Sequence, residues 1–274
     1  GEAMQNLESN GVAVNIASFL GAATTRILEV GYDNRPATDE EMERMRGHVK
    51  DAMEEGAMGI GSSLIYAPGD YASTEELIEL CKVASNYGGM YISHMRNEDS
   101  KVMSALEELI RISKEADIPA EIYHLKSSRK PNWKKIDDII KRVEEVRGQG
   151  LKITADIYTY NASSTGLTGV IPTWVQEGGH KAWIERMKDP NIRPRLLEDI
   201  RKELSEQPPE GILMVGFKTS EMSKKYLSKT VAEAAKMRGQ SPEEAIVDMV
   251  IEDDNRIQCI YFSMSEENIR KKIK

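Results

Sequence analysis

Short hydrophobic runs alternate with longer amphipathic segments over the first 160 residues of the chain. The runs typical of strands are 12–19, 57–64, 90–93, 119–123 and 151–157, and the segments typical of helices are 38–55, 73–87, 101–116 and 133–147. Two of these helices begin with a capping-box pattern, Thr38 with Glu41 and Ser73 with Glu76. The alternation predicts a parallel sheet covered by helices.

A parallel sheet of this kind is either doubly wound or closed into a barrel. Polar residues follow successive predicted strands at their carboxyl ends, namely His94, His124, and Asp156 with Tyr158. In a barrel these ends converge on one mouth. No GxGxxG motif follows the first predicted strand, so the dinucleotide-binding alternative lacks its phosphate loop. We therefore predict an α/β fold of the (β/α)8 TIM-barrel type.

The regular alternation stops after Tyr160. Residues 161–239 hold a Ser/Thr/Gly-rich stretch, helices and one strand candidate at 212–217, before a capping box at Ser241, a strand candidate at 257–262 and a helix from Ser265. We expect 161–235 to be an insertion that covers the barrel mouth. Residues 1–160 and 236–274 would then be parts of one barrel.

Composition narrows the classes of function. Of the 274 residues 40% are hydrophobic, enough for a sizeable core, and the net charge of -8 gives no electrostatic reason to expect nucleic acid or an anionic membrane as a partner. No run approaches the ~18 apolar residues of a membrane span, and no signal peptide is visible. Cys81 and Cys259 are far apart and are expected to be reduced core residues. These features predict a cytoplasmic protein with neither nucleic acid nor a membrane as partner, and they leave self-association into a homo-oligomer open.

His94 and His124 occupy matching positions at the ends of consecutive predicted strands. Neighbouring parallel strands lie ~4.8 Å apart, so the two side chains are able to share one divalent ion, and zinc favours imidazole nitrogen. The alternative is that each is a hydrogen-bonded histidine of the core or rim. Arg96 and Lys126 follow the two histidines and are either ligands for a substrate carboxylate or partners in salt bridges at the rim.

Several stretches together resemble the D-aminoacylase (N-acyl-D-amino-acid deacylase) branch of the amidohydrolase superfamily. They are residues 55–69 (EGAMGIGSSLIYAPG), 71–76 (YASTEE), 93–98 (SHMRNE), 124–126 (HLK), 155–160 (ADIYTY), 162–165 (ASST) and 261–266 (YFSMSE). These stretches follow the order of the family over nearly the whole chain.

The resemblance implies a zinc-dependent hydrolase of linear amides that removes the N-acyl group from N-acyl-D-amino acids. It implies that His94 and His124 are metal ligands. It also implies that Lys126 and Tyr158, with Ser163 or Ser164, contact the substrate carboxylate. In such an enzyme zinc polarises the acyl carbonyl and activates water, and an aspartate moves the proton.

The chain also departs from the family pattern. It contains no His-x-His pair, it has Gly21-Ala-Ala23 where relatives have a glycine-histidine-glycine, and the family's catalytic aspartate would lie beyond Lys274. The sequence is therefore expected to be an internal fragment, incomplete at both ends of the barrel, that alone holds zinc poorly and is inactive. The competing idea is that another residue, such as Glu98, Asp156 or Cys259, completes the metal site. The alternatives are a cyclic-amide amidohydrolase of the dihydroorotase or hydantoinase kind, and a non-catalytic barrel fragment.

Overall fold

Five parallel strands form one sheet, in the order in which they occur in the chain. They are β1 (Leu20–Gly21), β2 (Gly59–Ser63), β3 (Met90–His94), β4 (Ala120–Ile122) and β5 (Ile153–Ala155). The computed structural model describes residues 2–274. Within that range β1 and β5 each pair with one neighbour, so the sheet is open. The predicted α/β class is confirmed, and closure into a barrel is not seen in the described strands.

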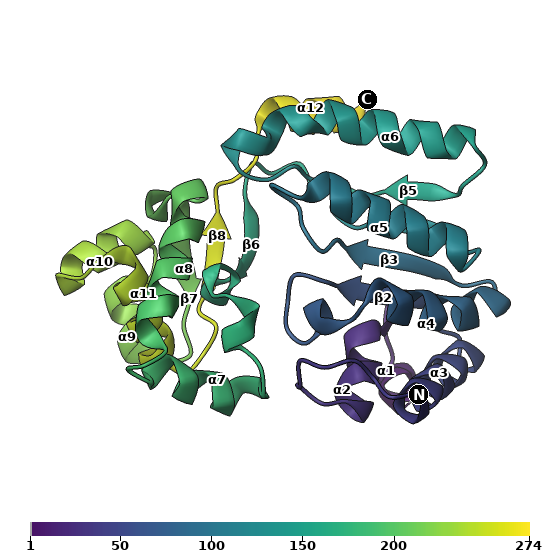
Figure 1. Cartoon of the computed structure of the whole chain (residues 1–274), viewed down its shortest axis with the longest axis horizontal. Helices are drawn as coiled ribbons and strands as arrows, with labels where there is room; N and C mark the ends of the chain where they lie inside the picture. Colours follow the sequence, from purple (N-terminus) through teal and green to yellow (C-terminus); the bar gives the residue numbers. More distant parts are fainter. Residues whose placement is uncertain (1) are drawn as a thin grey trace. The chain divides into compact units, whose positions relative to one another are not determined.

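Helices connect these strands and contact the sheet, as Figure 1 shows for α4 and α5. The helices of this part are α1 (Glu2–Asn10), α2 (Ala22–Glu29), α3 (Asp39–Glu54), α4 (Thr74–Asn86), α5 (Val102–Glu115) and α6 (Ile136–Gly148), with the 3-10 turn η1 (Gly69–Tyr71). The 3-10 turn η2 (Lys130–Lys135) belongs to the second part, described below. Leu77 and Leu80 of α4 and Leu106 and Leu109 of α5 are buried. Burial of each such side chain contributes roughly 1.5–3 kcal/mol to stability.

The two predicted capping boxes differ in outcome. At Thr38 both halves form, because the Thr38 side chain accepts from the Glu41 backbone and the Glu41 carboxylate accepts from the Thr38 backbone. At Ser73 the side chain accepts from the Glu76 backbone at 3.1 Å. The Glu76 carboxylate instead accepts from the buried Arg26 guanidinium at 2.6 Å. The ion pair with Arg26 has thus taken the place of the hydrogen bond that Glu76 would make to the Ser73 backbone in a full capping box.

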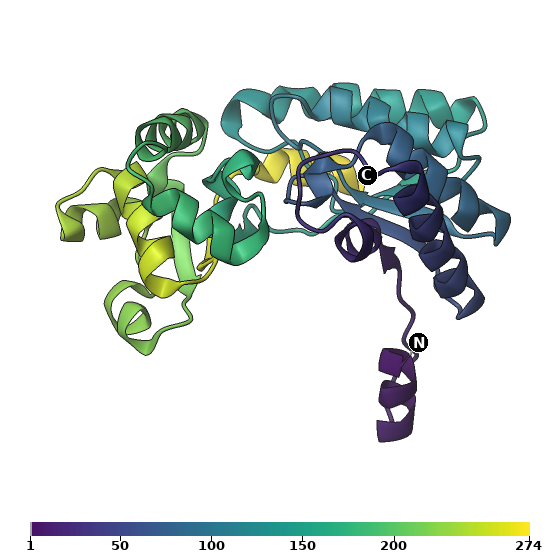
Figure 2. The same ribbon diagram turned by 60° about the horizontal axis from the view of Figure 1, so that its bottom comes forward.

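The predicted strand at 12–19 is wrong. The segment lies outside the strands, and Val12, Val14 and Ile16 are exposed. Its alternating β-branched residues favour extended backbone, but a strand also needs a partner, and β1 begins only at Leu20. Figure 2 shows the preceding helix α1, in purple at the N-terminus, extending away from the sheet.

A second sheet is antiparallel, in the order β6-β8-β7. It consists of β6 (Ser163–Gly166), β7 (Ile212–Gly216) and β8 (Gln258–Tyr261). The helices of this part are α7 (Gly179–Lys188), α8 (Arg193–Glu206), α9 (Ser220–Tyr226), α10 (Val231–Arg238), α11 (Pro242–Asp253) and α12 (Glu266–Ile273). Its 3-10 turns include η3 (Leu167–Val170), η4 (Thr173–Val175) and η5 (Pro209–Gly211). The core of this part includes Trp183, Met214, Ile246 and Cys259.

The chain divides into two compact units. One unit holds the chain up to Leu125 together with Asp138–Ile157, and the other holds Lys126–Asp137 together with Tyr158–Lys274. Strand β8 thus lies with β6 and β7, whereas the sequence analysis assigned 236–274 to the barrel and 161–235 to an insertion. As an assignment of domains, that division stays a prediction. Within the described residues, no helix has both the length and the apolar character that crossing a membrane requires.

Candidate metal centre

His94 and His124 are brought together at the carboxyl ends of β3 and β4. His94 is the last residue of β3, and His124 follows β4 by two residues. Nδ1 of His94 lies 2.8 Å from Nε2 of His124, and the ring centroids are 4.5 Å apart with the rings nearly perpendicular. Two residues that are 30 positions apart in the chain therefore meet, as expected for neighbouring parallel strands.

Glu98 joins the two histidines. Its Oε1 lies 3.1 Å from Nδ1 of His124, and its Oε2 lies 3.5 Å from Nε2 of His94. The exposed fractions of the three side chains are between 11 and 16%, so the group is largely shielded from water but still reachable. The three residues offer ligand atoms that lie within 4.8 Å of one another. Below, His94, Glu98 and His124 are called the His–Glu–His cluster.

The backbone at His124 has an unusual conformation that Asp156 supports. The φ angle of His124 is +44°, in the left-handed region that non-glycine residues adopt rarely. The Asp156 carboxylate accepts a hydrogen bond from the His124 backbone N–H, and the Asp156 carbonyl accepts from the N–H of Leu125 at 2.8 Å. Asp156 follows β5, so the third polar strand end holds the turn that presents His124.

Aromatic rings lie beside both imidazoles. The ring centroid of Tyr66 is 5.4 Å from that of His94, and the ring centroid of Tyr123 is 4.3 Å from that of His124. These rings limit the directions in which the imidazoles are able to turn.

Arg96 lies between His94 and Glu98 in the sequence, and its side chain binds Glu108 on helix α5. Its Nε and Nη2 donate to the Glu108 carboxylate at 2.8–3.1 Å. Burial disfavours the guanidinium charge of Arg96, but the hydrogen bonds and the charge of Glu108 outweigh it, so the pKa of Arg96 is raised. Arg96 is thus a partner in a salt bridge, one of the two roles expected for it.

The residues predicted to contact a substrate carboxylate lie in the second unit. Lys126 is buried, with Nζ 5.6 Å from the centre of the Tyr158 ring. Ser163 and Ser164 belong to β6, where Ser164 Oγ donates to the Cys259 carbonyl at 3.1 Å and Ser163 is in register with Tyr261. Lys126 and Tyr158 are therefore neighbours, and the substrate role of all four residues stays a prediction.

The donor set of the His–Glu–His cluster suits a metal ion. Two imidazole nitrogens and one carboxylate oxygen match the three protein ligands of catalytic zinc sites. One of the two facing nitrogens of His94 and His124 must carry a proton to form their hydrogen bond, and a metal would take the place of that proton. The sequence analysis identified the two histidines as ligands and named Glu98 only as one of three residues that could complete the site. The available signal was its position four residues after His94, but the intervening segment is irregular, so spacing alone does not predict where the carboxylate points.

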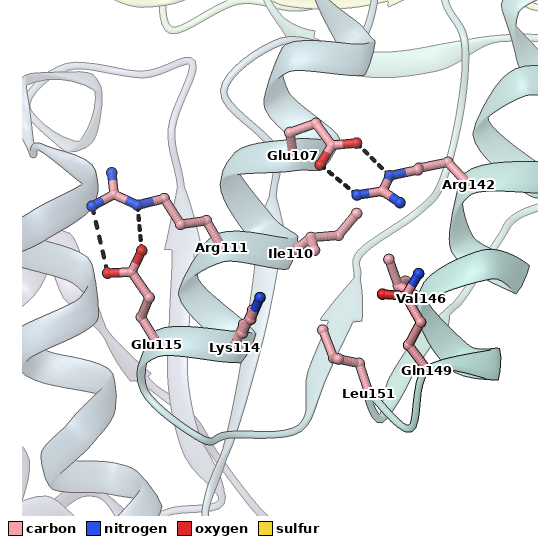
Figure 3. Close-up of a pocket in the computed structure, with 9 residues that line it drawn as sticks. All are labelled: Glu107, Ile110, Arg111, Lys114, Glu115, Arg142, Val146, Gln149 and Leu151. Carbon is pink, nitrogen blue, oxygen red and sulfur yellow. Dashed lines mark hydrogen bonds and ion pairs between the residues drawn. The ribbon is translucent and has the colours of Figure 1, made fainter.

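A hollow on the surface of the first unit lies elsewhere, between α5 and α6 (Figure 3). Its volume is about 450 Å³, and long charged side chains line much of it, with Glu107 bound to Arg142. Ligand pockets of this size are usually apolar with a few polar groups. None of the residues that line this hollow belongs to the His–Glu–His cluster.

No model of a protein family matches the chain. A D-aminoacylase of Alcaligenes xylosoxydans xylosoxydans is 38% identical over 161 residues, which are 59% of this chain and 33% of the relative. An N-acyl-D-glutamate deacylase of the same organism is 30% identical over 159 residues, 58% of this chain and 33% of the relative. The match thus spans about a third of the length of these curated relatives.

Solved structures resemble nearly the whole chain. The N-acyl-D-glutamate deacylase of Bordetella bronchiseptica, complexed with zinc and a phosphonate mimic of the tetrahedral intermediate, superposes with a TM-score of 0.76 at 24% identity, over 97% of this chain and 48% of that one. A D-aminoacylase structure that addresses the role of a binuclear metal centre gives 0.74 at 27% identity, over 96% and 46%. Another, which defines D-aminoacylase as a subset of the amidohydrolases, gives 0.72 at 28% identity, over 94% and 46%. Relatives and solved structures agree with the sequence motifs, and they confirm the resemblance of this chain to the D-aminoacylase branch of the amidohydrolases.

Proposed function

We propose that this chain carries the metal-binding part of a hydrolase that removes the N-acyl group from N-acyl-D-amino acids, with zinc as the metal. The observation that carries the proposal is the His–Glu–His cluster at the carboxyl ends of β3 and β4. Similarity to D-aminoacylase and N-acyl-D-glutamate deacylase supports the choice of reaction. A relative complexed with zinc supports the choice of metal.

The residues of the cluster have separable roles in this proposal. A bound zinc ion supplies a Lewis acid for the acyl carbonyl and lowers the pKa of its water towards neutrality. His94 and His124 would hold the ion through neutral imidazole nitrogens, and Glu98 would be the third ligand and offset part of the metal charge. Asp156 would keep His124 in place by accepting from its backbone N–H.

Lys126 and Tyr158 are proposed to hold the carboxylate of the amino acid, with Ser163 or Ser164 adding a hydroxyl donor. An ammonium group and phenol or serine hydroxyls are suitable donors to a carboxylate. The buried position of Lys126 and its closeness to the Tyr158 ring support a shared task for these two side chains. A fixed anchor for the carboxylate is also what discrimination between D and L substrates requires.

The experiment combines metal analysis with ligand binding. The purified chain is loaded with zinc, excess metal is removed, and bound zinc is counted by atomic absorption. Phosphonate mimics of the tetrahedral intermediate, built on D- and on L-amino acids, are then titrated by calorimetry, and release of free amino acid from N-acetyl-D-amino acids is followed in parallel. Binding is the primary readout, because it reports on the metal site and on the carboxylate contacts directly, whether or not the acyl group is cleaved.

The sequence analysis expected poor zinc binding because it assigned only two ligands. With Glu98 as the third ligand, we expect bound zinc and tighter binding of the D phosphonate in the wild-type chain, and loss of both in H94A. A chain that retains no zinc, or that binds D and L phosphonates equally, would contradict the proposal. Turnover of a hydantoin or dihydroorotate in place of linear amides would favour a cyclic-amide amidohydrolase.

For the cellular setting we propose the cytoplasm, with a small molecule and neither nucleic acid nor membrane as the partner. The two cysteines support a reducing compartment, because both are free and buried. Whether the protein forms a homo-oligomer is checked by light scattering of the purified chain.

A further inference from the structure

The segment that follows β3 carries Glu98 to the cluster through irregular backbone, so something other than helix or strand pairing must hold it. Residues 95–100 are neither helix nor strand. The Asn97 side chain accepts from the backbone N–H groups of Asp99, at 3.0 Å, and Lys101, at 2.7 Å. One of these bonds ends at Lys101, the N-cap residue of α5, and neither bond reaches the connection between β2 and α4.

Arg96 supplies that attachment. Besides the bonds to Glu108 on α5, its Nη1 donates to the carbonyl of Asp70 at 2.8 Å and its Nη2 donates to the carbonyl of Ala72 at 2.8 Å. Both carbonyls belong to the connection between β2 and α4. One guanidinium therefore joins three pieces of chain: its own segment, the β2–α4 connection and helix α5.

The β2–α4 connection leads back to the cluster. The backbone N–H of Asp70 donates to the carbonyl of Tyr66 at 3.0 Å, and the Tyr66 ring lies beside the His94 ring. The hydroxyl of Thr74, at the start of α4, donates to the Glu108 carboxylate at 2.8 Å. The pair of Arg96 and Glu108 is thus connected to the cluster in two ways. Hydrogen bonds through Asp70 lead to Tyr66, whose ring lies beside His94, and the backbone leads from Arg96 to Glu98.

We propose that Arg96 is a positioning residue of the metal centre. By binding Glu108 and the carbonyls of Asp70 and Ala72, it fixes the segment that presents Glu98 to His94 and His124. A planar fork of donors is required, since a lysine ammonium is a point charge that does not meet a carboxylate and two carbonyls in the same geometry. This inference rests on the proposed function in so far as the cluster holds a metal.

The test compares R96A, R96K and E108Q with a matched control pair on the same helix. Glu107 adjoins Glu108 and binds Arg142 through both carboxylate oxygens on the surface (Figure 3). E107Q removes this ion pair and R142K removes its two-point geometry, at a place that does not reach the cluster. Zinc affinity is measured by competition with a chromogenic chelator. The absorption spectrum of the cobalt-loaded chain reports the ligand geometry, and thermal unfolding reports stability.

A metal-independent readout is the nuclear magnetic resonance of the imidazole nitrogens in the metal-free chain. The chain has four histidines. His48 pairs with Glu29 and His180 pairs with Asp254, so these two serve as internal references for His94 and His124.

We expect R96A to shift the imidazole signals of His94 and His124, to alter the cobalt spectrum and to weaken zinc binding by about 10–100-fold. R96K and E108Q should give partial effects of the same kind, and they carry the test if R96A does not fold.

The control variants should match the wild type in imidazole signals, cobalt spectrum and zinc affinity. A lower melting temperature with unchanged imidazole signals, cobalt spectrum and zinc affinity would show a merely structural role and overturn the inference. If the wild-type chain binds no zinc but the R96 variants still shift both imidazoles, the positioning role stands and the proposed function fails.

Discussion

The carboxylate of Asp156 accepts a hydrogen bond from the backbone N–H of His124, across 32 residues of sequence. Asp156 follows β5 and His124 follows β4, so the bond links the ends of two neighbouring strands. Its effect is on backbone conformation, because it supports a histidine whose φ is +44°. Asp156 therefore belongs to the candidate site as the residue that supports the turn at His124.

Replacement of Asp156 by alanine should weaken both the fold and zinc binding. A hydrogen bond to a charged group contributes about 1.5–3 kcal/mol, and the His124 turn would lose that support. We expect a loss of this size in the free energy of unfolding in urea. Loss of an outer-shell partner should also lower zinc affinity by about 10–100-fold in the chelator competition.

The matched variant for Asp156 is asparagine, which keeps an acceptor oxygen of nearly the same shape. D156N should retain most of the zinc affinity that D156A loses. Equal zinc affinity in D156A and the wild type would show that the turn at His124 does not depend on this carboxylate.

Replacement of Glu98 by glutamine tests its assignment as a ligand. A neutral amide neither offsets the metal charge nor matches the carboxylate as a ligand for zinc, so E98Q should bind zinc at least about 10-fold more weakly. The control is E121Q, since Glu121 lies on β4 and accepts from Thr154 Oγ1 at 2.8 Å. If E98Q and E121Q bind zinc as tightly as the wild type, the ion is held by the histidines without Glu98.

The two cysteines should be unreactive in the native chain. Burial raises the pKa of the Cys259 thiol to about 12 and also raises that of Cys81, so the reactive thiolate is scarce at pH 8. We expect Ellman's reagent to label neither thiol in buffer and both in guanidinium chloride. Rapid labelling of one thiol in native conditions would show that its surroundings open readily.

The sequence predicts elements best where the signal is local. The box of Thr38 and Glu41 marks the start of α3, and the apolar face through Leu106, Leu109 and Ile110 identifies α5. The strand prediction at 12–19 fails because β propensity does not supply a partner. The pairing of β6 with β8 joins residues 95 positions apart, as in the bond from Ser164 to Cys259, and no local pattern indicates it.

The residues of the candidate site also differ in how far the local sequence predicts them. His94 and His124 are predictable because parallel strands place their carboxyl ends at one edge. Glu98 and Arg96 lie in an irregular segment, where the direction of each side chain depends on contacts with other parts of the chain. Asp156 was noticeable as a polar strand end, but its bond to a backbone N–H becomes evident only once the turn at His124 is seen.

The Glu41 carboxylate at the start of α3 should make the free energy of unfolding decrease at acid pH. Hydrogen bonds from the Arg35 side chain and from the Thr38 backbone lower the pKa of Glu41 from its ordinary value of 4.5 to about 2. A depressed carboxyl pKa contributes stability that is fully present above about pH 4.5 and is lost as pH falls through the folded-state value near 2. We expect the free energy of unfolding in urea to decrease between pH 4.5 and pH 2, and to decrease less in E41Q.

E40Q is the control, because Glu40 lies in the same first turn outside the capping box. If E41Q and E40Q lose stability in parallel with the wild type over this range, the ion pair of Glu41 with Arg35 does not contribute to the acid response.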